Sequence, residues 1–146
     1  MNRFSRSAAL LIIIAVAGLA GCSSSSSSPS DSPPPPAHLT VGSHGTVSVV
    51  LTPLGAQRTG VQTAVATRAA GGGQTVVPYS ALLYQPDGSS VIYAVTGPLT
   101  YTLVPVTVTS VQGNQVYLTG LAPGTTVVTI GGEELLGVQD GVAVQT

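Results

Sequence analysis

The stretch SVQGNQVYLTGLAPGTTVVTIGG, residues 110–132, decides the fold class of this 146-residue chain. Its hydrophobic residues alternate with polar ones, stop at glycines and then alternate again, as in half-buried strands joined by turns. It contains no His, Cys, Lys, Arg, Asp or Glu. The stretch therefore predicts β-hairpin structure and argues against an enzyme site within it.

Similar patterns, rich in Val and Thr, extend along the second half of the chain, and β-branched residues favour strands. They predict strands near 46–51, 61–66, 75–77, 81–84, 91–95, 101–109, 115–119, 126–130 and 142–144. Turn signals such as Pro86-Asp87-Gly88 and Gln112-Gly113-Asn114 separate them at intervals typical of small barrels and sandwiches. We predict an all-β fold, a small barrel-like antiparallel domain, over residues 40–146.

Two local features refine this prediction. Val104, Val106 and Val108 should share one face of their strand, and Pro105 should place that strand at an edge or bulge because proline cannot donate to a ladder. Helix is nearly absent from the prediction. One helical turn is expected at 53–58, with Thr52 as its N-cap.

The N-terminus, MNRFSRSAALLIIIAVAGLAGC, has the order of a signal peptide. Two arginines precede an apolar run at 8–20, which is short for a membrane span but suits the apolar region of a signal peptide. Leu19-Ala20-Gly21-Cys22 resembles the lipobox of bacterial lipoproteins. We expect residues 1–21 to be removed by cleavage between Gly21 and Cys22, and the Cys22 thiol to carry a diacylglycerol group. The alternatives are an uncleaved membrane anchor and a cysteine that stands at this position by chance.

Residues 22–39 are predicted to be the lipidated cysteine and a tether, since SSSSSSPSDSPPPP at 23–36 cannot bury a core. The tether would be a spacer between the domain and the membrane. With the signal peptide and the lipid on Cys22, we expect the protein at the cell membrane, on its extracytoplasmic side. A proline-rich ligand for another domain and O-glycosylation of the serines are further readings of the same segment.

Charge and cysteine usage exclude several classes of protein. After processing, the chain keeps two arginines and five acidic residues, for a net charge of −3, so it lacks the basic stripe that a nucleic-acid-binding protein needs. Cys22 is the only cysteine, so neither an internal disulfide nor a cysteine-based metal cluster is possible. We expect no cofactor and no metal.

The remaining candidates for chemistry are few. His38 and His44 would need further ligands to hold a metal, and exposure at the junction of tether and domain is the simpler reading. Glu133 and Glu134 could be an acid/base pair, but adjacent residues on a strand point to opposite faces, so solvated charges at the rim of the sheet are the simpler reading. The five tyrosines, 79, 84, 93, 101 and 117, either line a ligand surface or pack at the edge of the core.

A series of motifs occurs in a fixed order along the domain: VLT at 50–52, QRTGVQTAV at 57–65, VPYSALLY at 77–84, DG at 87–88 with VIY at 91–93, VPVTV at 104–108, GLAPGTTVVTIGG at 120–132 and LLG at 135–137. Together they resemble the membrane-proximal region of periplasmic adaptor (membrane fusion) proteins of efflux pumps. Leu103 stands where a basic residue is common in that family.

The resemblance implies a barrel-like domain that contacts an inner-membrane transporter and has no enzyme activity. The lipoyl domain and helical hairpin of the family are absent, since the chain has no room for them between Gly42 and Thr75. We therefore expect a lipid-anchored extracytoplasmic interaction module associated with a membrane transporter. The alternative is an extracytoplasmic lipoprotein that binds a small ligand or a cell-wall component in a tyrosine-lined groove. An enzyme is least favoured, because no nucleophile–base pair or metal triad is visible.

Overall fold

The computed structural model describes residues 34–142. The predicted signal peptide, Cys22 and most of the predicted tether lie outside these residues. The described part is built mainly from strands, with two α-helices and two short 3₁₀ turns at Ser43–Gly45 and Tyr79–Ala81. The strands are β1 (Ala37–Val41), β2 (Val47–Leu51), β3 (Gln62–Val65), β4 (Thr67–Arg68), β5 (Thr75–Pro78), β6 (Leu83–Tyr84), β7 (Ser90–Gly97), β8 (Thr100–Gln112), β9 (Gln115–Thr119) and β10 (Thr126–Ile130).

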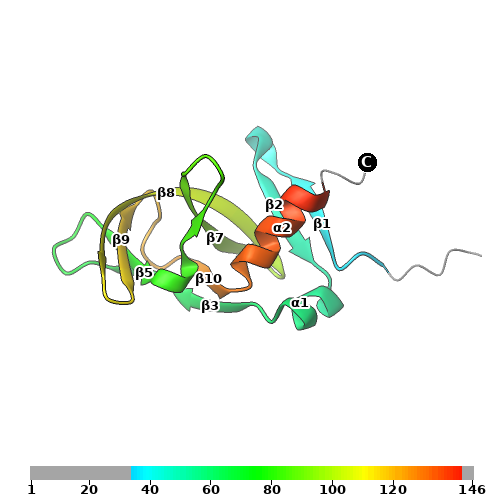
Figure 1. Cartoon of the computed structure of the whole chain (residues 1–146), viewed down its shortest axis with the longest axis horizontal. Coiled ribbons are helices and arrows are strands. Elements are labelled where there is room, and N and C mark those ends of the chain that lie inside the picture. The colour runs from blue at the N-terminus through cyan, green and yellow to red at the C-terminus, as the bar shows by residue number, and fades with distance from the viewer. Residues whose placement is uncertain (1–33, 143–146) are drawn as a thin grey trace, which may run out of the picture. The chain divides into compact units, whose positions relative to one another are not determined.

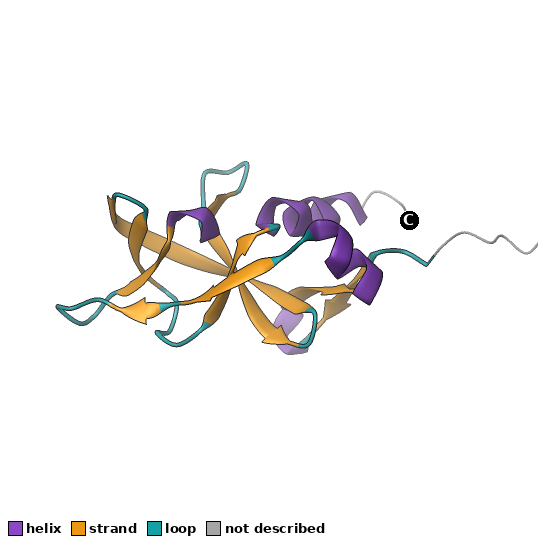
Figure 2. Cartoon of the chain, turned by 90° about the horizontal axis from the view of Figure 1, so that it is seen from below, coloured by secondary structure: helices purple, strands orange, loops and turns teal. Residues whose placement is uncertain are grey.

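Seven of these strands form a nearly closed barrel in the order β3-β10-β7-β8-β9-β5-β4, and every pairing is antiparallel. The two ends of this path, β3 and β4, are separated in the chain by Ala66 alone. Ala66 donates its N–H to the Thr125 carbonyl at 2.8 Å and accepts from the Gly124 N–H at 2.8 Å. The sheet thus returns to the segment on which it began, which confirms the predicted all-β, barrel-like fold (Figures 1 and 2).

The long strand β8 connects the barrel to an outer hairpin formed by β1 and β2. It pairs with β2 at Thr100–Thr102, with β7 up to Val106, and with β9 from Thr107 onward. Pro105 therefore lies where β8 has β7 as its only partner, in keeping with the expected local edge. Val106 is buried in the barrel and Val104 and Val108 pack beside it, so the predicted shared face is confirmed.

Two hydrophobic cores lie on opposite sides of the barrel wall. The inner core fills the barrel, and its buried members are Ala66, Val77, Ala81, Leu82, Ile92, Val106, Val116, Leu118, Leu121 and Val127. The outer core lies outside it, and its buried members are Ala37, Val49, Leu51, Leu83, Val91, Tyr93, Tyr101, Val128 and Leu135. Strand β7 contributes to both because successive side chains point to opposite faces of a sheet.

The first helix, α1 (Pro53–Thr59), agrees with the predicted helical turn. The Thr52 hydroxyl accepts the Gly55 N–H at 3.0 Å, as expected for an N-cap, and Pro53 opens the helix. The helix ends at Gly60, which has left-handed backbone angles and donates its N–H to the Ala56 carbonyl. This helix sits between β2 and the start of the barrel.

The second helix, α2 (Gly132–Val142), corrects the sequence prediction. Val142 ends this helix, so a strand beginning at that residue is wrong, and residues 143 and 144 lie outside the described part. Glu133 and Glu134 occupy the first turn, where acidic side chains interact favourably with the helix dipole. Leu135 and Val138, three residues apart, both face the outer core. Burial of both side chains on one side favours a helix over a strand, in which residues three apart would point to opposite faces.

The N-terminal boundary also differs from the prediction. Residues 37–39, assigned to the tether, begin strand β1, which pairs with β2 from Ala37↔Leu51 to Val41↔Val47. Ala37 is buried in the outer core and Leu39 packs against it. Because Ala37 and Leu39 pack on the outer core and β1 pairs with β2, strand structure begins at Ala37 and not at residue 40. The two-residue strand β4 was also not predicted.

Candidate binding groove

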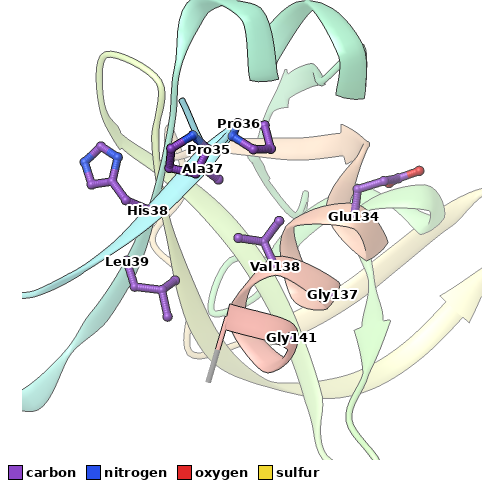
Figure 3. A pocket seen from close by; sticks show the side chains of 9 residues that line it. All are labelled: Pro35, Pro36, Ala37, His38, Leu39, Glu134, Gly137, Val138 and Gly141. Atoms are coloured by element: carbon purple, nitrogen blue, oxygen red, sulfur yellow. The ribbon is translucent and has the colours of Figure 1, made fainter. Parts of the chain in front are cut away.

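A groove of about 770 Å³ lies between β1 and α2. Figure 1 shows α2 beside β1 and β2, on the outside of the barrel. The residues that line the groove come from the start of the chain's folded part and from one face of the helix, namely Pro35, Pro36, Ala37, His38, Leu39, Glu134, Gly137, Val138 and Gly141 (Figure 3). Most of these side chains are apolar or absent, so the groove suits an apolar occupant.

The strand side of the groove is fixed by α1. The Pro36 carbonyl accepts the Thr52 N–H at 2.9 Å and the Thr52 hydroxyl at 3.1 Å. Gly55 packs directly against the same carbonyl, and a Cβ added there would collide with it. Since Thr52 is also the N-cap of α1, one side chain holds both the helix end and the point where the chain enters β1.

The helix side of the groove consists of Glu134, Gly137, Val138 and Gly141, which follow the i, i+3, i+4, i+7 spacing of one helix face. Val138 points across the groove toward Ala37 in Figure 3. The helix is held to the barrel by Leu135, which is fully buried, and by a hydrogen bond of 2.9 Å from the Tyr93 hydroxyl to Gln139 Oε1. Burial, with the charge of Asp140 as a second cause, raises the pKa of Tyr93 well above its usual value.

The two titratable side chains of the groove, His38 and Glu134, lie apart from each other (Figure 3). His38 is exposed, as expected, and in Figure 3 its ring points away from Glu134, on the other side of the groove. The backbone of His44 lies in the 3₁₀ turn between β1 and β2. Within residues 34–142, no group of three His, Cys, Asp or Glu side chains is arranged to hold a metal ion.

Glu133 and Glu134 are both exposed, so they are solvated charges as predicted, although they lie on a helix and not on a strand. Gly21 and Cys22, the predicted cleavage and lipidation residues, lie outside the described part of the chain. Over the part that is described, no helix has both the length and the apolar character needed to cross a membrane.

The five tyrosines do not form one surface. Tyr93 and Tyr101 are buried in the outer core, where burial raises the pKa of both phenols, while Tyr79 and Tyr84 are exposed. Tyr117 is half-buried on β9. The groove between β1 and α2 has no tyrosine in its lining, so a tyrosine-lined groove is not what the structure offers at this place.

The groove was not predicted from the sequence, because neither β1 nor α2 was predicted. A signal was present on the helix side: Glu133-Glu134 followed by Leu135, Val138 and Val142 has the charge and spacing of an amphipathic helix. The strand side has little sequence signal, because only AHLTV separates the prolines from Gly42.

Comparisons of this chain with protein-family models, with curated proteins and with solved structures gave no match.

Proposed function

We propose that this protein is a lipid-anchored extracytoplasmic interaction module that associates with a membrane transporter through the groove between β1 and α2. The observation that carries the proposal is the position of the groove. Pro35 and Pro36, which line it, belong to the predicted tether at 22–39. An extended chain rises at most about 3.6 Å per residue, so the segment from Cys22 to Pro36 keeps the groove within about 50 Å of the membrane.

The order of motifs along 50–137 supports the choice of a transporter as partner. In the adaptor proteins that the chain resembles, this region contacts the inner-membrane component of an efflux pump. The barrel-like sheet is compatible with that resemblance. Between Gly42 and Thr75 this chain has no room for the lipoyl and hairpin domains, so we propose that the module acts on the transporter side, as an accessory subunit.

Site-specific crosslinking in the native membrane tests this proposal. A photoreactive amino acid at His38, which lines the groove and is exposed, should give an adduct with a membrane transporter, identified by mass spectrometry. The same amino acid at Asp87, on the exposed turn between β6 and β7, is the matched control and should not. Adducts that are the same from both positions, or none with a membrane protein, would overturn the proposal.

The lipid anchor has a separate test. Labelling with a palmitate analogue should mark the wild-type protein and should be lost in Cys22→Ser, which should also release the protein from the membrane fraction. Label that persists in Cys22→Ser would show that the anchor lies elsewhere.

A second candidate function is the binding of a small apolar ligand. The volume of about 770 Å³ favours it, because small-molecule sites generally measure about 300–1,000 Å³ and have mostly apolar linings. A thermal-shift screen with lipids, drugs and glycans tests it, since a ligand that binds only the folded state raises the melting temperature. A rise that disappears in Gly137→Leu would assign the ligand to this groove.

A further inference from the structure

The free edge of β1 presents backbone groups to the groove. The pairs Gly42–Thr46 and Pro36–Thr52 are hydrogen-bonded, with Gly42 N–H to Thr46 at 2.8 Å and Thr52 N–H to Pro36 at 2.9 Å. In an antiparallel ladder every second residue bonds to the same neighbour, so His38 and Thr40 also face β2. The N–H and C=O groups of Ala37, Leu39 and Val41 therefore point away from β2.

These outward groups have no hydrogen-bond partner among residues 34–142, where β1 pairs with β2 alone. Ala37 is only 6% exposed, so its backbone groups have little access to water. Buried backbone groups are almost always paired in folded proteins. The edge of β1 beside the groove is thus suited to receive another strand.

The facing helix leaves room for such a strand. Gly137 and Gly141 both face the groove, and a Cβ added at either would meet nothing within 4 Å. Glycine is unfavourable in the interior of a helix, and packing within this chain does not require it at these positions. What the two glycines provide is a helix surface that a partner backbone can approach closely, next to the apolar side chain of Val138.

The charge of the groove identifies the kind of partner. Glu134 is the only acidic side chain in the lining, it is exposed, and no Lys or Arg lines the groove with it. A basic side chain on the occupant would complement it. The β1 edge of a second copy has the sequence AHLTV, which carries no Lys or Arg, and neither residues 23–33 nor residues 143–146 contain one. The charge of the groove therefore favours a strand from another polypeptide.

We propose that the groove binds an extended segment of a partner polypeptide by strand addition. The segment hydrogen-bonds to the backbone of Ala37 and Leu39, places apolar side chains against Val138, and carries a Lys or Arg that reaches Glu134. Main-chain bonds to an exposed sheet edge are a general mode of peptide recognition. The inference rests on the proposed function in taking a polypeptide as the partner, and it adds the chemistry that selects it.

The test uses the full-length protein purified from its host and a displayed library of random ten-residue peptides. Enriched peptides should alternate apolar β-branched residues and carry Lys or Arg at one end. Their binding should slow amide hydrogen exchange at Leu39 and leave His38 and Thr40 unchanged, since those two already pair with β2. This internal control separates strand addition from a general stabilisation of the fold.

Variants locate the peptide. Gly137→Leu and Gly141→Leu, which fill the groove with a good helix former, should each weaken binding at least tenfold, and Glu134→Gln about threefold for the basic peptides. Gln57→Leu adds the same side chain to the exposed face of α1 and should bind as the wild type does. Circular dichroism checks that each variant is folded.

Three results would overturn the inference: no enriched peptide, peptides that bind Gly137→Leu as tightly as the wild type, or binding without protection of Leu39. A dimer in sedimentation that Gly137→Leu dissociates would also overturn it, because the occupant would then be a second copy. Failure here alongside a transporter adduct from His38 would leave the proposed function standing and reject only the strand-addition mode.

Discussion

The inner and outer cores of this protein are built from similar numbers of buried residues but are closed in different ways. The inner core is entirely aliphatic and is enclosed by strands that pair around it. The outer core contains two buried tyrosines and is covered by α1, α2 and the β1–β2 hairpin. Its cover is incomplete between β1 and α2, and the groove lies at that gap. The inner core is thus fully enclosed by strands, while the outer layer contains the groove.

Two leucines that are both fully buried test this division most strongly. Leu118 lies in the inner core and Leu135 on α2 in the outer core. Leu→Ala at such positions costs about 2–5 kcal/mol. We expect Leu118→Ala to lower the free energy of unfolding by about 3 kcal/mol or more and to reduce hydrogen-exchange protection throughout the barrel.

Leu135→Ala should instead act locally, because α2 contacts the barrel only from outside. Exchange should speed up in α2 and β1, with β9 little changed, as expected for a segment that opens separately from the rest. Equal loss of protection in β9 and α2 for both variants would show that the two cores unfold as one unit.

The same division explains which parts of the fold could be predicted from sequence. Inner-core residues such as Val104, Val106 and Val108 alternate with exposed ones, so the period of two is visible in the chain. Strand β7 contains the apolar run Val91–Ala94 because it is buried on both faces. The extent of this strand was still predictable from the sequence.

The outer layer was harder to predict, since its elements depend on partners distant in the sequence. Strand β1 forms because Ala37 and Leu39 pack on the outer core, and the five-residue segment carries little pattern of its own. In α2 the glycines at 137 and 141 lower the helix propensity and conceal the period. The groove lies between these two elements, so it was missed together with them.

Two helical glycines, Gly55 in α1 and Gly137 in α2, differ in what an added side chain would meet. At Gly55 an added methyl group would collide with the Pro36 backbone, whereas at Gly137 it would enter open space. Overpacking costs about 1–3 kcal/mol, so we expect Gly55→Ala to destabilise the protein by about 2 kcal/mol despite its better helix propensity. Gly137→Ala should stabilise it by up to about 1 kcal/mol.

Urea unfolding of both variants measures the difference, and hydrogen exchange locates it. Gly55→Ala should increase exchange at His38 and Thr40, since the displaced Pro36 carbonyl would lose its bonds to Thr52. If both substitutions stabilise the protein equally, the contact between α1 and the entry to β1 does not hold the strand wall of the groove in place.

The smallest effect concerns Tyr93, whose hydroxyl bonds Gln139 across the outer core. Removing it in Tyr93→Phe should cost about 1 kcal/mol at neutral pH. Burial raises the pKa of Tyr93 and Tyr101 in the folded state. Their contribution to the free energy of unfolding is therefore complete below about pH 10, the pKa of an unfolded tyrosine, and is lost as the pH rises above it.

Urea unfolding from pH 8 to 11 should show wild-type stability falling above pH 10, and a shallower fall in Tyr93→Phe with Tyr101 still present. Tyr84→Phe, at an exposed position, is the control and should follow the wild type. If the free energy of unfolding falls equally steeply with pH in the wild type and in Tyr93→Phe, this phenol ionises freely in the folded protein. The helix α2 then covers the outer core less tightly than the hydrogen bond between Tyr93 and Gln139 implies.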